Sequence, residues 1–120
     1  MKTVRIAAAC IAVSFAAHAA FTKWYETGWA RISSPILFLV FAYVFLSLAK
    51  RKPWTLKPAI CAAMATTVLH LAFFPTPKYF GEVTWLAKCF AVVDISIGAY
   101  LWFVLSKAST QAWLLDSEHS

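Results

Sequence analysis

The chain alternates between long apolar segments and short polar connections. The apolar segments cover residues 6–21, 32–49, 58–74 and 83–105. At a rise of 1.5 Å per residue they span roughly 24 to 35 Å, and the hydrocarbon core of a bilayer is about 30 Å thick. The pattern therefore predicts an all-α integral membrane bundle of four transmembrane helices. We expect a single membrane domain over 1–120, with a short cytoplasmic tail over 106–120.

The proline positions agree with these boundaries. Pro35 follows two serines, as a first-turn proline follows a capping residue. Pro58 opens the third segment, and Pro75 and Pro77 follow its end. No proline is expected in the middle of a helix, where it would remove a backbone hydrogen bond.

The composition supports a membrane protein and indicates how it is oriented. Hydrophobic residues make up 62% of the chain and charged residues 13%, too few to cover a soluble surface of this size. The net charge of +6 comes from basic residues that flank the apolar segments, so it favours membrane lipid as the partner rather than nucleic acid. Because basic residues gather on the cytoplasmic side, we expect a cell (inner) membrane protein with both termini in the cytoplasm. The residues on that side are Lys2, Arg5, Lys50, Arg51, Lys52, Lys57 and Lys107, against Lys23, Arg31 and Lys78 on the other.

The N-terminal segment has a second interpretation. Lys2 and Arg5 precede an apolar stretch, and Ala17-His18-Ala19 fits the small-x-small pattern of a signal-peptide cleavage site. Removal of residues 1–19 would leave three transmembrane helices with the same orientation.

Three ionisable residues are predicted to lie inside the membrane at one depth. Asp94 is at the midpoint of the fourth segment, where an unpaired carboxylate costs about 2.5–3.5 kcal/mol. Lys88 is 240° away around the helix, so a partner of Asp94 should come from another helix. His18 and His70 are each about 18 Å from the inner edge of their segments, and Asp94 is about 16 Å from the same edge.

Small and polar residues accompany these three. Ser14 precedes His18 by one helical turn, and Thr66 and Thr67 precede His70 by three or four residues. Such residues let helices approach closely and hydrogen-bond to one another. We therefore predict polar interhelical contacts by Thr66, Thr67 and Ser14.

Intramembrane charge often marks an ion or proton pathway, which leads to the first functional hypothesis. The chain would move a proton, an ion or a small solute, as a homo-oligomer, with Asp94, His70 and His18 as ion- or proton-binding residues. The alternative is a non-enzymatic accessory, assembly or immunity subunit that binds a larger membrane protein through Asp94. A third hypothesis is a b-type haem carrier with His18 and His70 as axial ligands.

No enzymatic reaction is predicted, because the sequence has neither a catalytic Ser/His/Asp order nor a Gly-rich phosphate loop. No ligand cluster of short spacing is present, so no metal and no cofactor are expected. The three cysteines have no CxxC spacing and are interpreted as small buried hydrophobic residues: Cys10, Cys61 and Cys89.

Overall fold

A computed structural model describes residues 2–22, 28–75 and 84–115 of the chain, and the regular structure in them is helical. The α-helices are α1 (Lys2–Phe21), α2 (Ala30–Ala49), α3 (Leu56–Ala72), α5 (Thr84–Leu105) and α6 (Ala108–Leu115), with the 3₁₀ turn η2 (Pro53–Thr55) before α3. Helices α1, α2, α3 (with η2) and α5 are long and apolar enough to cross a membrane. The all-helical part of the predicted fold class is thus confirmed, together with its four membrane-length helices.

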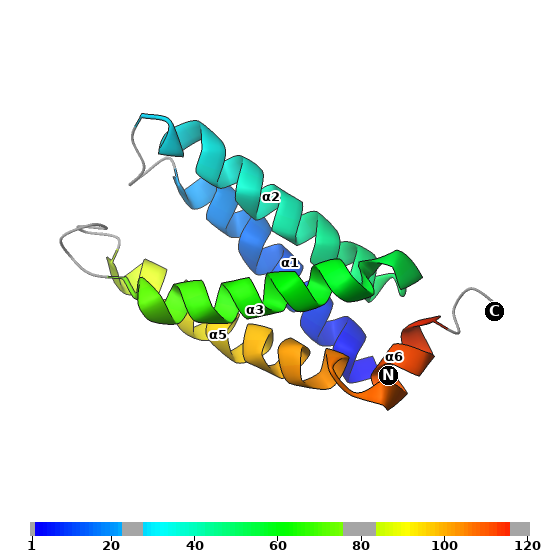
Figure 1. The fold of residues 1–120 in the computed structure, drawn as a ribbon. Helices are drawn as coiled ribbons and strands as arrows, with labels where there is room; N and C mark the ends of the chain where they lie inside the picture. The colour runs from blue at the N-terminus through cyan, green and yellow to red at the C-terminus, as the bar shows by residue number, and fades with distance from the viewer. Residues whose placement is uncertain (1, 23–27, 76–83, 116–120) are drawn as a thin grey trace.

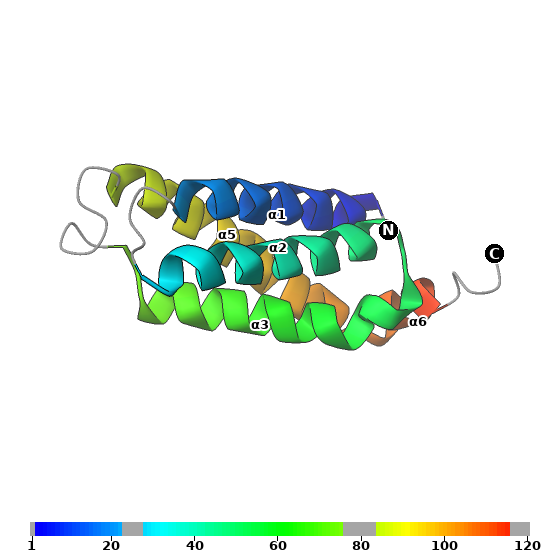
Figure 2. The same ribbon diagram turned by 90° about the horizontal axis from the view of Figure 1, so that it is seen from above.

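The four long helices form two sequential pairs. Helix α1 packs mainly against α2, and α3 packs mainly against α5. Figure 1 shows the two pairs close together at the end that carries the N-terminus and α6, and further apart at the opposite end. Seen from above, α3 and α6 lie at one side of the bundle and α1 at the other (Figure 2). The end where the pairs converge is the one predicted to face the cytoplasm.

The core of the bundle lies in this convergent half. It is built from small residues, which allow close approach, and from larger side chains that fill the remaining space. Fully buried members include Ala8, Ile11, Phe45, Leu48, Ala59, Ala63, Leu101 and Leu105. Many side chains on the opposite faces of the helices are large, apolar and exposed, as a lipid-facing surface requires.

Helices α2 and α3 each begin two residues before the predicted start, which changes the positions of their prolines. Helix α2 begins at Ala30, so Pro35 lies inside the helix rather than in its first turn. The carbonyl left without an N–H partner is that of Arg31, whose side chain is exposed near the helix start. Pro58 is the third residue of α3, where the backbone N–H has no partner within the helix in any case. Pro77 lies outside the described residues.

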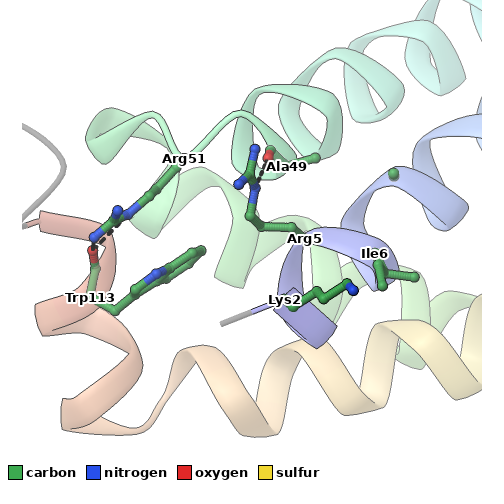
Figure 3. A pocket seen from close by; sticks show the side chains of 7 residues that line it. Lys2, Arg5, Ile6, Ala49, Arg51 and Trp113 are labelled. Atoms are coloured by element: carbon green, nitrogen blue, oxygen red, sulfur yellow. Dashed lines mark hydrogen bonds between the residues drawn. The ribbon is translucent and has the colours of Figure 1, made fainter.

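The predicted C-terminal tail contains a docked helix over its described part. Leu114 of α6 is fully buried, and Gln111 Nε2 donates a hydrogen bond to the carbonyl of Leu105 at the end of α5. Arg51 donates to the carbonyl of Trp113 from Nη2 at 2.6 Å, and its guanidinium lies 4.9 Å from the centre of the Trp113 ring (Figure 3). A cation at a helix C-terminus stabilises the unpaired carbonyls there.

The cysteines were expected to be buried, and this is wrong. Cys10, Cys61 and Cys89 are all exposed on the outside of the bundle. The outer surface of a membrane protein is as apolar as its interior, so hydrophobic character does not distinguish the two.

We predict that α1 remains in the mature protein. It contributes Val4, Ala8, Ile11 and Phe15 to the buried core, and its removal would expose their partners on α2 and α5. Intact mass spectrometry with peptide mapping of protein extracted from its membrane should show a subunit that retains residues 1–19. A smaller subunit that begins at Ala20 would contradict the prediction.

Candidate functional site

Asp94 of α5 is the only acidic residue in the described part of the chain, and its side chain is 0% exposed. Its carboxylate lies between α1 and α3, with His18 Nδ1 at 3.2 Å and His70 Nε2 at 3.3 Å from the same oxygen, Oδ2. The partners of Asp94 therefore come from other helices, as predicted. Lys88, one and a half turns away on the same helix, is exposed.

Ser14 fixes the direction of the carboxylate. Its hydroxyl donates a hydrogen bond of 2.6 Å to Asp94 Oδ1, from α1 to α5. A hydroxyl-to-carboxylate bond of this length is of the strong, charge-assisted kind. Because Oδ1 is held by Ser14, Oδ2 is turned toward the two histidines. The interhelical polar contact predicted for Ser14 is present.

The hydrogen bond made by Nδ1 of His70 determines the tautomer of this imidazole. His70 Nδ1 lies 2.7 Å from the backbone carbonyl of Thr66, one turn earlier on α3. A carbonyl oxygen can only accept, so Nδ1 carries the hydrogen. In a neutral imidazole Nε2 then has a lone pair, and this lone pair faces a carboxylate oxygen at 3.3 Å.

His18 is held among aromatic rings. Its ring centre is 4.4 Å from that of Phe90 on α5 and 5.1 Å from that of Phe38 on α2, and the side chain is 7% exposed. The approach of His18 Nδ1 to Asp94 is close but not aligned as a hydrogen bond. Within the described residues neither His18 Nδ1 nor Asp94 Oδ2 has a hydrogen-bond partner. Such unpaired polar atoms are uncommon in a protein interior and call for a physical explanation.

A cation between these atoms would supply the missing interaction. The ligand-type atoms of His18, His70 and Asp94 all lie within 4.8 Å of one another. A proton shared by Asp94 and a histidine removes the lone-pair repulsion. A metal ion does so too: two tetrahedral ligands about 2.1 Å from zinc are about 3.4 Å apart, close to the observed 3.2 and 3.3 Å. Metal-bound histidines also commonly donate their second N–H to a backbone carbonyl, as His70 does.

A cavity of about 270 Å³ connects this cluster with the wider end of the bundle. Its walls are apolar apart from the histidines and Thr66, and they come from α1, α2, α3 and α5. Phe73, Pro75 and Ala87 line it near the ends of α3 and α5, on the side predicted to be outer.

The opposite side of the cluster is closed. Going inward from Ser14 on α1 and from Asp94 on α5, the fully buried side chains include Ile11 and Ala8, and Leu101 and Leu105. Phe45 and Leu48 of α2 fill the same level, and all six are fully buried. Among the described residues, the cavity lining therefore extends from the cluster toward the wider end of the bundle, and apolar side chains fill the other side.

Thr66 and Thr67 contribute differently from the prediction. Thr67 donates its hydroxyl hydrogen bond to Ala63 of its own helix, at 2.9 Å, and the buried hydroxyl of Thr66 has no partner in the described residues. Their contact with α5 is steric, because a Cβ added to Gly98 would lie 3.0 Å from Thr67 Oγ1 and 3.3 Å from Thr66 Cγ2. Within a helix, threonine readily satisfies its hydroxyl on the preceding turn, which the spacing alone did not reveal.

The structure thus brings together His18, His70, Asp94 and Ser14, while their role in ion or proton binding stays a prediction. Sequence reasoning missed Phe38 and Phe90, whose rings contact His18, since aromatic residues on apolar helices carry no distinguishing pattern. It also expected no metal ligands, because ligands 52 and 24 positions apart along the chain form no short motif.

Comparison of the chain with protein-family models, with curated proteins and with solved structures finds no match.

The close packing at Gly98 yields a test of the helix arrangement. We predict that Gly98→Leu lowers stability by roughly 1–3 kcal/mol, because a side chain there must push α3 away from α5. Thermal unfolding in mild detergent measures this. Ala99→Leu is the matched control, since the neighbouring Ala99 is exposed on the same helix and should tolerate the change. Equal effects of the two substitutions would show that α3 and α5 do not approach closely at Gly98.

Proposed function

We propose that this chain moves a cation across the cell (inner) membrane, as a homo-oligomer with both termini in the cytoplasm. Asp94, His70 and His18 bind the cation. The observation that carries the proposal is the approach of His70 Nε2, on a partly buried side chain, to Oδ2 of the fully buried Asp94, two electron-rich atoms 3.3 Å apart. Their arrangement is favourable only with a positive charge between them.

The proton is the simplest cation for this site. With one proton shared between His70 and Asp94, the pair is neutral overall, which lowers the cost of burying it in a low-dielectric interior. His18, 3.2 Å from the same oxygen, provides a second position to which that proton can pass. Proton relays in membrane proteins are built from such groups of Asp, Glu and His residues.

A cavity on one side of the cluster and apolar packing on the other favour transport by a change of conformation over an open channel. The cavity leads from the wider end of the bundle to the histidines, and the apolar core closes the other half. Release to the cytoplasmic side requires the two helix pairs to move apart at that end. In a homo-oligomer, a second copy of the chain bound to the exposed apolar face of α2 would provide a fixed surface along which the helix pairs move.

The alternative of an accessory subunit loses its main support. That hypothesis needs Asp94 to seek a basic residue on a larger membrane protein, and Asp94 instead has Ser14, His18 and His70 in its own chain. The geometry gives no support to a haem either. Asp94 Oδ2 lies within 3.3 Å of both histidine nitrogens, and so takes the place that an axially ligated iron would need.

We predict that Asp94→Asn abolishes transport without unfolding the bundle. An amide keeps the shape and the hydrogen bond with Ser14 but has no charge to hold a cation. Protein reconstituted in liposomes with a pH-sensitive dye inside should dissipate an imposed pH gradient, and the variant should match protein-free liposomes.

Ser96→Ala is the control for this experiment, because Ser96 is on the same helix but exposed. It should behave like the unmodified protein. Proton flux through Asp94→Asn equal to that of the control would sink the proposal.

A divalent transition metal is the second candidate cation, favoured by three ligand-type atoms within 4.8 Å of one another, two of them 3.2 and 3.3 Å from Asp94 Oδ2. If the metal is the cargo, purified protein incubated with zinc and desalted should retain about one ion per chain by elemental analysis. His18→Gln and Asp94→Asn should both lose it. Cys10→Ala should not, since this thiol is exposed away from the cluster. Zinc retention unaffected by either cluster substitution would exclude the metal and leave the proton.

A further inference from the structure

A second site lies at the opposite end of the bundle from the cavity that reaches the histidines. A hollow of about 550 Å³ is bounded by the start of α1, the end of α2, the loop after it and α6. Figure 3 shows the side chains of Lys2, Arg5 and Arg51 around it. Its described lining thus includes three cationic side chains.

The cations are positioned by the fold. Arg5 Nε donates a hydrogen bond of 2.8 Å to the carbonyl of Ala49, the last residue of α2. This bond uses one of the five N–H groups of the guanidinium and fixes its plane. Arg51 is held by the carbonyl of Trp113, and its backbone has φ of +60°, a conformation that costs energy in a residue with a side chain. This left-handed conformation belongs to the end of α2, where the N–H groups of Arg51 and Lys52 donate to the carbonyls of Leu48 and Ser47.

The apolar part of the hollow continues toward the membrane interior. Ile6 and Ala9 line it one and two turns along α1 from Lys2. A ligand with a charged end near Arg5 and an apolar end along α1 matches this sequence of surfaces. A lipid has this form, and a free anion lacks the apolar part.

We propose that this hollow binds the phosphate group of an anionic phospholipid headgroup, with the acyl chains along α1. Guanidinium groups bind phosphate oxygens in a planar, bidentate manner, and basic pockets between helices on the cytoplasmic side are typical sites for anionic headgroups. The volume is in the range of ordinary ligand sites. This site is separate from the cation-binding cluster, and its occupation does not depend on transport.

The test measures lipid retention by native mass spectrometry of detergent-purified protein. Phosphatidylglycerol and phosphatidylcholine with the same acyl chains are titrated in parallel. We expect phosphatidylglycerol to remain bound where phosphatidylcholine dissociates. Lys2→Gln and Arg5→Gln should each weaken its binding about fivefold.

Lys57→Gln is the matched control, because Lys57 is an exposed cation at the same end of the bundle but does not line the hollow. It should leave lipid binding unchanged. Arg5 also bonds to the end of α2, so Arg5→Gln could unfold the protein for a structural reason. Lys2 is exposed, and Lys2→Gln therefore measures the loss of lipid binding in a folded protein.

Two results would overturn the proposal. The first is equal retention of the two lipids, or equal weakening of phosphatidylglycerol binding by Lys57→Gln and Lys2→Gln. Either would show that the hollow attracts lipid no more than any other basic surface does. Displacement of phosphatidylglycerol by inorganic phosphate at equal concentration would show that the hollow serves a soluble phosphate and not a lipid.

Discussion

The burial of one carboxylate determines how the rest of this bundle is arranged. Asp94 is fully buried among apolar helices, where an unpaired charge costs several kcal/mol. Its oxygens are met by Ser14 and His18 from α1 and by His70 from α3, so three helices must lie in one register to satisfy it. The fourth helix, α2, contributes the ring of Phe38 against His18. A shift of any helix by one turn would separate these groups, and the polar cluster therefore specifies the fold as well as the site.

The sequence allowed the helices, their approximate ends and the shared depth of the three ionisable residues to be predicted, because each depends on distance along one helix. Lengths near 20 apolar residues and the spacing of Ser14 from His18 are local properties. The convergence of His18 and His70 on one oxygen of Asp94 depends on the rotation of each helix about its own axis. The sequence does not determine this rotation, because the faces of these helices are apolar and similar in composition. The same limit explains the cysteines, which an apolar surface accommodates as readily as an apolar interior.

The two ends of the bundle have opposite characters. At the wide end an apolar cavity reaches the histidines, and at the convergent end arginine side chains bind the last carbonyls of α2 and α6. The cationic end suits a membrane surface of negative charge, while the cluster between the ends suits a single positive charge. Lipid binding at the convergent end would hold together the helix ends whose separation the proposed transport requires, and would therefore favour the closed state.

The pairing of helices in sequence order has a consequence for the biogenesis of the protein. Helices α1 and α2 are neighbours in the chain and pack together, so this hairpin forms as soon as both have entered the bilayer. It must then present Ser14 and His18 to the lipid until α5 arrives, 80 residues after Ser14. Helix α5 in turn enters with Asp94 unpaired, and the carboxylate gains its partners only as the two hairpins meet. The pairing of Asp94 on α5 thus depends on α1 having stayed nearby.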